Sequence, residues 1–541
     1  MQASSNARHR KAAKRALCPL INKRLMEAAE SGKVTSLLAI VAQHLPEMNL
    51  VNLTTALHRI AKLKSENQLV AETLTQDRHQ RMLSDLLATT AQVLRLSDPG
   101  LNASRRQALS ILVWSLATLE RVHLELIQIA VSLSEGRLHE LKPFELASTL
   151  WAFARLGQLS PAAKHMSSGV YRSAGESIVT SMDQLGFRFL TMVAWSLAVT
   201  GNTDPELFGR MASRLLSMIR RAEIKPDLLL ELAEAFGSKG FRHEDLLLEV
   251  AWVASNRGAL ETFDCHSLSQ LCEVMISEGV FCGQLVLRCA RLAEVGSMQP
   301  QDLAAVVVAV SNGRSLNSAA ASSVSILAPA CTHLVQNFDS NTLASVSWGI
   351  ALTAKSQPNS RDGSQQVVSQ EVMTFFQAVL PIALRRVTNC SGAALVRFAA
   401  TFSRLSLAAM AEQQLHQAIA SRLMSCVGLL DAADLALFFA NVPATQQSAY
   451  QAVWPNLCSE AANQIDSFAD EDVRCIDDVC LERLRMPVDQ NNNFARHRYE
   501  VATRLRYLGQ QNGGTMAAPM QQSFSGNNNW KQQQQQQQQQ Q

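Results

Sequence analysis

The residues that could do chemistry in this chain recur at one position of a repeated sequence pattern. They are Lys62, Thr118, Arg155, Ser238, Ser277, Asn312 and Arg404. Each lies nine residues after a leucine that begins a similar segment, and apolar or small residues complete the same column in the other segments. Variable polar side chains at equivalent positions of a repeated helix could read single-stranded RNA, one base per repeat. The competing interpretation is that these positions face solvent and vary because nothing restrains them.

Motifs for catalysis, cofactor binding and metal binding do not occur in the sequence. There is no phosphate-binding loop, no glycine-rich dinucleotide motif, no HExxH and no GxSxG. The 11 cysteines include no CxxC pair, and no group of cysteines and histidines has the spacing of zinc ligands. We therefore expect no enzyme activity, no cofactor and no metal site, and we interpret the cysteines as buried small apolar residues in a reducing compartment.

The elements that must position the candidate column are ten similar segments. Each begins at an anchor leucine: Leu53, Leu109, Leu146, Leu190, Leu229, Leu268, Leu303, Leu343, Leu395 and Leu435. The intervals between anchors run from 35 to 56 residues, and most lie near 39. A period in this range indicates a helical repeat array. The prediction is an all-α fold, an α-solenoid of about 10–11 helix–turn–helix repeats of roughly 39 residues.

The pattern within each segment predicts one buried helix face. Positions 0, 3, 4, 7 and 8 after the anchor are apolar or small, which is the spacing of one face of an α-helix. We expect positions two, six and nine to lie away from that face. Tryptophans recur at position five as Trp114, Trp151, Trp195 and Trp348. We interpret them as packing residues, with stacking against a ligand as the alternative.

Glycine and proline residues mark the expected helix boundaries. Glycines occur eleven residues after four anchors, at Gly157, Gly201, Gly240 and Gly279. We expect them to end helices in the left-handed conformation. Pro161 and Pro205 are expected to begin the next helix. A second helix is predicted in the intervals, notably at 205–221, 244–257, 283–296 and 371–386.

The ends of the chain differ from the repeats. Residues 1–24 contain seven Lys or Arg and no acidic residue, which fits a transit segment, a nucleic-acid-binding arm or a solvated tail. The repeats are predicted over 25–487, with a polar insertion at 356–370 and a weak last unit near Val473. Residues 488–541 are rich in Asn and Gln and end in a polyglutamine run, so we expect a disordered tail. No segment is long and apolar enough for a membrane span, and we expect no membrane association.

The segments LASTLWAFARLG (146–157) and MVAWSLAVTG (192–201), with the opening INKRLMEAAESGKVTSLLAIV, carry a family resemblance. The region 20–450 resembles the octotricopeptide-repeat proteins of organelles and the related FAST-kinase-like and RAP-domain proteins. The resemblance implies an α-solenoid that binds single-stranded RNA in an organelle and acts in RNA processing, stability or translation. We find no RAP segment, so its nuclease activity is not expected here. The expected location is the mitochondrion, with plastid or cytoplasm as alternatives.

The distribution of charge keeps a second function open. The whole chain carries a net charge of +3, but beyond residue 24 acidic residues exceed basic ones by four. Affinity for nucleic acid depends strongly on neutralised phosphates, so this balance does not by itself favour RNA. The alternative is a protein-binding scaffold of the HEAT or armadillo type, in which the groove or the Gln-rich tail recruits protein partners.

Overall fold

The described part of the chain is α-helical, with short 3-10 turns and no strand. A computed structural model describes residues 17–476, except for 97–102, 222–223, 238–240, 257–260, 262, 314–322, 355–368, 406–409, 443–446, 465–466, 470–471 and 473–474. Within this part, no helix has the length and apolar character that crossing a membrane requires. The chain divides into two compact units, one up to Val379 and one from Leu380.

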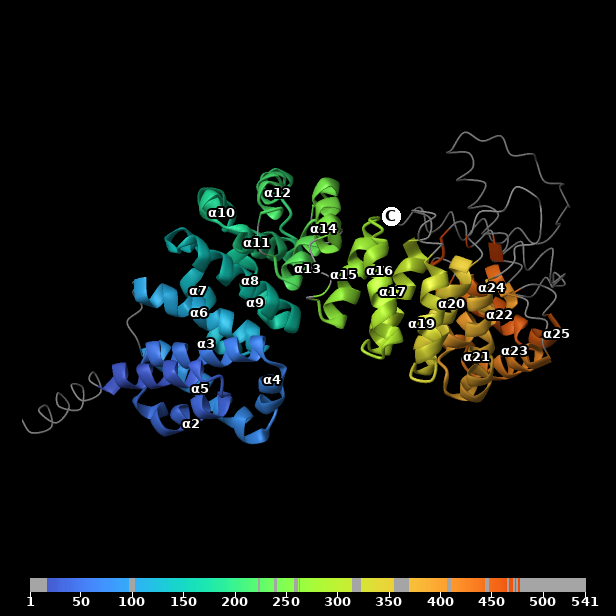
Figure 1. Cartoon of the computed structure of the whole chain (residues 1–541), viewed down its shortest axis with the longest axis horizontal. Helices are drawn as coiled ribbons and strands as arrows, with labels where there is room; N and C mark the ends of the chain where they lie inside the picture. The colour runs from blue at the N-terminus through green and yellow to red at the C-terminus, as the bar shows by residue number, and fades with distance from the viewer. Residues whose placement is uncertain are drawn as a thin grey trace, which may run out of the picture. The chain divides into compact units, whose positions relative to one another are not determined.

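Eight helices of the first unit contain anchor leucines, and each contacts the next (Figure 1). We call this series row A: α3 (Leu50–Glu66), α6 (Ala103–Leu119), α8 (Pro143–Leu159), α11 (Phe187–Thr200), α13 (Pro226–Ala235), α15 (Cys265–Ser277), α17 (Pro300–Asn312) and α20 (Ser340–Ala354). Consecutive row A helices therefore cover one another along their length.

A second set of helices packs against row A and forms row B. It comprises α5 (Asp77–Leu96), α7 (Leu124–Ser134), α9 (Pro161–Arg172), α12 (Pro205–Ile219), α14 (Glu244–Asn256), α16 (Gly283–Glu294) and α19 (Val324–Leu334). Each of them contacts a row A helix, and α5–α7–α9 and α12–α14–α16–α19 also contact in sequence. The helix α2 (Val34–His44) precedes row A and packs against α3 and α5, and the short helices α4 (Gln68–Leu74) and α10 (Gly175–Ser181) lie in the connections. The expected all-helical architecture of packed helix pairs is confirmed, and it is consistent with an α-solenoid.

Local sequence explains where the row A helices begin. Asn49 and Asp264 accept a hydrogen bond from a first-turn backbone N–H of α3 and α15, which satisfies an otherwise unpaired donor. Proline occupies the first position of α8, α13 and α17, where its missing N–H costs nothing. All ten anchor leucines are at most 5% exposed. Nine of them are the fourth residue of their helix, the exception being Leu109, so the predicted helical register is correct.

Position six differs from the expectation that it faces away from the core. Ser115, Ala152, Ser196 and Ala235 hold this position in four consecutive row A helices, and all four are buried. The position lies where adjacent row A helices approach closely. Gly349 illustrates the constraint, because a Cβ atom there would lie 3.0 Å from Val307 Cγ1 on α17. Small residues occupy position six in six of the eight row A helices, because a larger side chain would separate adjacent helices; Arg59 of α3 and Val274 of α15 are the exceptions.

The predicted helix boundaries are mostly correct. Gly201 and Gly279 adopt positive φ angles of 75° and 83° at the ends of α11 and α15, and Pro161 and Pro205 begin α9 and α12. The prediction that Gly157 ends a helix is wrong, because Gly157 lies inside α8. A Cβ at Gly157 would approach Lys164 Cα to 3.3 Å, so close packing of α9 accounts for this glycine. Gly240 lies outside the described residues.

The chain termini are only partly described. Residues 17–30 form a helix in which Ile21 and Leu25 are fully buried, and Asn52 Nδ2 donates to the carbonyl oxygen of Cys18 at 2.9 Å. Residues 17–24 of the basic N-terminal segment therefore belong to the packed part of the chain. Residues 1–16, residues 355–368 of the expected insertion, Val473 of the weak last unit and the tail at 488–541 lie outside the described residues.

The second unit contains two further helix pairs. Its helices are α22 (Gly392–Leu405), α23 (Met410–Leu423), α24 (Ala432–Asn441), α25 (Gln447–Tyr450) and α26 (Trp454–Asn463), and the boundary between units falls within α21 (Gln370–Arg386). Tyr450 and His416 are fully buried and joined by a hydrogen bond of 2.8 Å between the phenol oxygen and Nδ1. Phe438 packs against Tyr450 with ring centroids 5.2 Å apart. This aromatic cluster holds α23, α24 and α25 together.

Two glycine substitutions test the close approach of row A helices. Gly349→Ala should destabilise the protein by about 1–3 kcal/mol, because its Cβ forces α17 and α20 apart. Gly209→Ala should stabilise it by about 0.5–1 kcal/mol, because Gly209 lies inside α12 and an added Cβ meets nothing within 4 Å. Urea unfolding followed by circular dichroism measures both. Equal effects at the two sites would contradict tight packing at position six.

Candidate functional site

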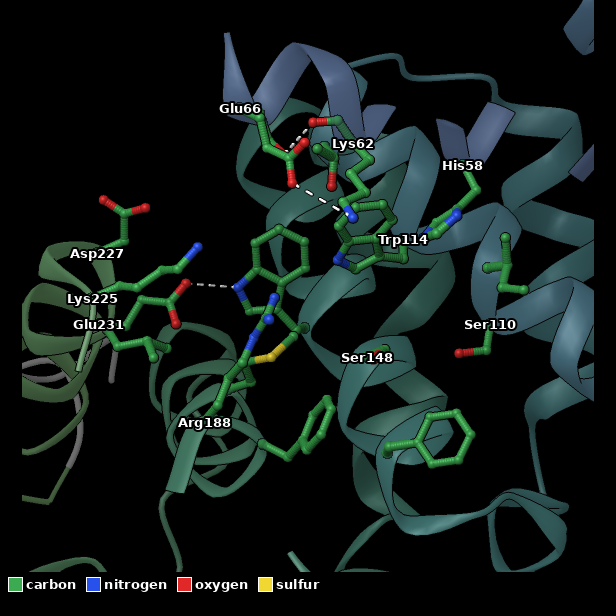
Figure 2. Close-up of a pocket in the computed structure, with 18 residues that line it drawn as sticks. His58, Lys62, Glu66, Ser110, Trp114, Ser148, Arg188, Lys225, Asp227 and Glu231 are labelled. Atoms are coloured by element: carbon green, nitrogen blue, oxygen red, sulfur yellow. Dashed lines mark hydrogen bonds and ion pairs between the residues drawn. The ribbon is translucent and has the colours of Figure 1, made fainter. Parts of the chain in front are cut away.

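A cavity of about 550 Å³ opens on row A of the first unit (Figure 2). Side chains from α3, α6, α8, α11 and α13 line it. Most of them come from positions two, five and nine after the anchors, together with position two before the anchor. Because consecutive row A helices present these positions side by side, the cavity is a product of the repeated pattern. We call it the aromatic cavity.

Aromatic rings form much of the wall. His58, Trp114 and Trp151 occupy position five of three consecutive row A helices, and all three are half-buried. The rings of His58 and Trp114 lie 5.2 Å apart between centroids. Phe144 and Phe189 line the cavity from α8 and α11, with centroids 6.4 Å apart and Phe144 43% exposed. Exposed ring faces of this kind can stack against planar ligands.

Two tryptophan–glutamate hydrogen bonds fix one end of the cavity. Trp151 Nε1 on α8 donates to Glu231 Oε1 on α13 at 2.8 Å, and Figure 2 marks this bond. Trp195 Nε1 on α11 donates to Glu234 Oε2 on α13 at 2.7 Å. The first bond spans two steps of row A, because α11 lies between α8 and α13 in the series. It therefore sets the spacing of three consecutive helices.

Glu231 has an unusual environment for a carboxyl group. Its Oε2 is shielded from solvent, and no described residue makes a hydrogen bond to it. The pKa of Glu231 is raised from 4.5 to about 7, mainly by burial and in part by the negative charges of Asp227 and Glu234. The hydrogen bond from Trp151 and the positive charge of Arg155 act in the opposite direction. The result is a carboxyl group that titrates near neutral pH in the wall of the cavity.

The remaining charged side chains surround the opening. In Figure 2, Lys225, Asp227 and Glu231 lie on one side of the cavity. His58, Lys62 and Glu66 of α3 lie on another side, and Lys62 Nζ is 3.6 Å from Glu66 Oε1. Burial, followed by the charges of the neighbouring Arg59 and Lys62, lowers the pKa of His58, so its ring is uncharged at neutral pH.

Two cations at the opening are available for a ligand. Arg188 and Lys225 are exposed, and neither has an ion-pair partner among the described residues. Unpaired, exposed cations beside aromatic rings can contact the phosphates of a bound nucleic acid.

The predicted site residues are only partly brought together. Lys62 and Thr118 line the aromatic cavity. Arg155 is half-buried on α8, where its Nη1 donates to Gln158 Oε1 at 3.1 Å, and it does not line the cavity. Ser277 and Asn312 are exposed at the ends of α15 and α17, away from the cavity lining.

The other two predicted residues fall elsewhere. Arg404 lies on α22 in the second unit, and Ser238 lies outside the described residues. Position nine is therefore only one edge of the surface that the structure forms.

Sequence reasoning placed too little weight on position five. The tryptophans there were visible in the sequence, and Trp195, at 2% exposure, has the expected packing role. Trp114 and Trp151 instead line the cavity. Arg188 and Phe144 lie two residues before their anchors, a position that the repeat pattern did not single out. Their common spacing was the available signal, because positions −2, 2, 5 and 9 fall on one helix face.

Among the described residues, no three His, Cys, Asp or Glu side chains are grouped so that they could hold a metal ion.

No protein-family model matches the chain, and no curated protein matches its sequence significantly. The class of protein is therefore defined only by its fold and its cavity. The described residues form packed helix pairs, and row A carries a cavity lined by aromatic rings and by side chains of both charges.

The raised pKa of Glu231 predicts a pH-dependent stability. A carboxyl group whose pKa is higher in the folded state favours folding when it is protonated, so its contribution is lost as pH rises from about 4.5 to about 7. The loss is at most about 3 kcal/mol. Glu231→Gln keeps an acceptor for Trp151 and cannot ionise. The variant should gain stability relative to the wild type as pH rises from 5 to 8 in thermal melts, and a constant difference would contradict the assignment.

Proposed function

We propose that this chain is an RNA-binding helical repeat protein that takes single-stranded RNA on row A and acts in RNA processing, stability or translation in an organelle. The observation that carries the proposal is the aromatic cavity, where half-buried rings lie beside exposed cations that have no ion-pair partner among the residues that the structure describes. Proteins that bind single strands combine these two features, because bases stack on aromatic rings and cations follow the backbone.

The rings account for the base contacts. Trp114 and Trp151 line the cavity from consecutive helices, so two neighbouring ring faces are available to successive bases. Stacking of one base on an aromatic side chain contributes about 1–3 kcal/mol. We propose that position five, with positions two and nine beside it, forms the base-reading surface. In this proposal, the 10–11 repeats of about 39 residues present the same positions along the RNA.

The cations account for the backbone contacts. Arg188 and Lys225 lie at the opening, and Lys62 lies across from them in a weak, exposed pair with Glu66. An exposed ion pair of this kind contributes about 0–1 kcal/mol, so Lys62 can exchange Glu66 for a phosphate at little cost. A local group of cations can thus bind RNA although the body of the chain carries a slight excess of acidic residues.

The organellar part of the proposal rests on the sequence. The resemblance to octotricopeptide-repeat and FAST-kinase-like proteins and the basic segment at residues 1–24 support a mitochondrial location, with plastid and cytoplasm as alternatives. Fractionation of cells that express the full chain with a C-terminal tag tests the location. Crosslinking of RNA to the same protein, followed by sequencing, tests the function, and recovery of no more RNA than an inert control would exclude it.

A protein-binding scaffold is the second candidate function. Glu66, Asp227 and Glu231 also line the cavity, and this acidic content favours a ligand with hydrogen-bond donors or positive charge. A basic peptide from a protein partner would satisfy that requirement. Competition between an oligouridine RNA and an arginine-rich peptide for the purified protein separates the two candidates.

A pair of charge reversals tests the backbone contacts. Arg188→Glu with Lys225→Glu should weaken binding of a 12-nucleotide oligouridine and reduce the slope of log affinity against log salt by about 1–2, because two phosphate contacts are lost. Arg172→Glu with Arg210→Glu is the matched control, since both residues are exposed on row B helices. Fluorescence anisotropy at several salt concentrations measures the effect. If both double variants bind alike, the cavity is not the RNA surface.

A tryptophan pair tests the base contacts. Trp114→Ala should lose about 1–3 kcal/mol of binding free energy for the same RNA, because a stacking surface is removed. Trp252→Ala is the control, since Trp252 is 44% exposed on α14 in row B. Circular dichroism first establishes that both variants fold. A loss of affinity in Trp252→Ala equal to that in Trp114→Ala would place the RNA elsewhere.

A further inference from the structure

We propose that the aromatic cavity selects guanine over the other bases, with the carboxyl group of Glu231 accepting hydrogen bonds from the donor edge of the base. This inference rests on the proposed function and adds a base preference to it. It follows from what surrounds Glu231, from what the other lining residues can contribute, and from which base supplies the missing partners.

The carboxyl group of Glu231 is held in place and incompletely satisfied. The indole N–H of Trp151 donates to Oε1 at 2.8 Å, which fixes the side chain in the cavity wall. Oε2 is shielded from water and has no hydrogen-bond partner in the described part of the chain. A shielded polar atom without a partner costs about 1–3 kcal/mol. A ligand that brings hydrogen-bond donors to this carboxyl group, after a small turn of the side chain, removes that cost.

Guanine is the base that supplies such donors. An ionised carboxylate only accepts hydrogen bonds, so its best partner presents two donors side by side. The N1–H and 2-amino groups of guanine form this pair. Adenine and cytosine present one amino group beside an acceptor nitrogen, and uracil presents one N–H between two carbonyl oxygens. For these bases, an acceptor lone pair would face the carboxylate, which is unfavourable.

The rest of the cavity fits a nucleotide attached to that base. Its volume of about 550 Å³ lies within the usual range of small-ligand sites, about 300–1,000 Å³. Trp114 offers a ring face, and Ser148 offers a hydroxyl group to the acceptor atoms of the base. Arg188 and Lys225 lie at the opening, where they can contact a phosphate.

The same cations argue against a basic side chain as the natural partner of Glu231. An arginine or lysine from a protein would also satisfy a carboxylate. It would, however, have to pass Arg188 and Lys225, which repel a like charge, although Glu66 and Asp227 in the same lining attract it. A neutral base is not repelled by these cations, and the phosphates beside it can contact them. Guanine in a nucleic acid therefore satisfies both the carboxyl group and the two cations, whereas a basic side chain satisfies the carboxyl group alone.

The experiment compares three RNAs that differ at one base. Each is a labelled 12-nucleotide oligouridine with guanosine, inosine or adenosine at its centre, and binding to the full chain is measured by fluorescence anisotropy at pH 8. This pH is above the Glu231 pKa of about 7, so the carboxyl group is mostly ionised. The guanosine RNA should bind about tenfold or more tighter than the adenosine RNA. The inosine RNA, which lacks the 2-amino donor, should bind with intermediate affinity.

Matched variants assign the preference to Glu231. Glu231→Gln should bring the guanosine and adenosine affinities together. Glu234→Gln should keep the wild-type preference, because Glu234 lies on the same helix, accepts from Trp195 and does not line the cavity. Trp151→Phe removes the N–H that positions Glu231 and should reduce the preference. Thermal melts verify that each variant folds.

The possible outcomes separate the two proposals. Equal binding of the three RNAs, or tighter binding of the adenosine RNA, overturns the guanine preference and leaves RNA binding in place. A guanine preference that survives in Glu231→Gln also overturns the role of Glu231. If none of the three RNAs binds, the proposed function fails and the preference fails with it.

Discussion

The structure depends on the burial of each row A helix between its two neighbours. A single helix pair cannot remove its apolar surface from water, so every unit completes the core of the next. This constraint fixes the anchor leucines, which are at most 5% exposed in all ten segments. It also favours small residues at position six of most row A helices, where Ser196 and Gly349 allow helices to touch. The aromatic cavity lies on the face of row A that is not used for packing between helices.

The fold could be predicted from the sequence because its determinants are local and repeated. Helix periodicity, capping residues such as Asp204 and first-turn prolines such as Pro205 act within a few residues of each other. Because these signals recur in each segment, they indicate which parts of every segment are helices and which are turns. Gly157 is the exception, because its role depends on the approach of Lys164 in the next helix. The local sequence does not distinguish a glycine that is needed for packing between two helices from a glycine that ends a helix.

The candidate site was harder to predict because it depends on the spacing and the rotation of neighbouring helices. Repeat analysis placed Lys62 and Thr118 in one column of the helix pattern, and both line the cavity. It could not show that Trp151 would reach Glu231, 80 residues away in the sequence. That contact requires the actual spacing of α8, α11 and α13. Burial of Glu231, the largest cause of its raised pKa, is likewise a property of the assembled helices, to which Asp227 and Glu234 of the same helix add their charges.

The bond between Trp151 and Glu231 also has a mechanical meaning. It ties α8 to α13 past an intervening helix, so it acts as a strut that resists extension of this segment of the repeat array. The side chain that faces the cavity is thus also a structural link between two row A helices, so its position depends on their spacing.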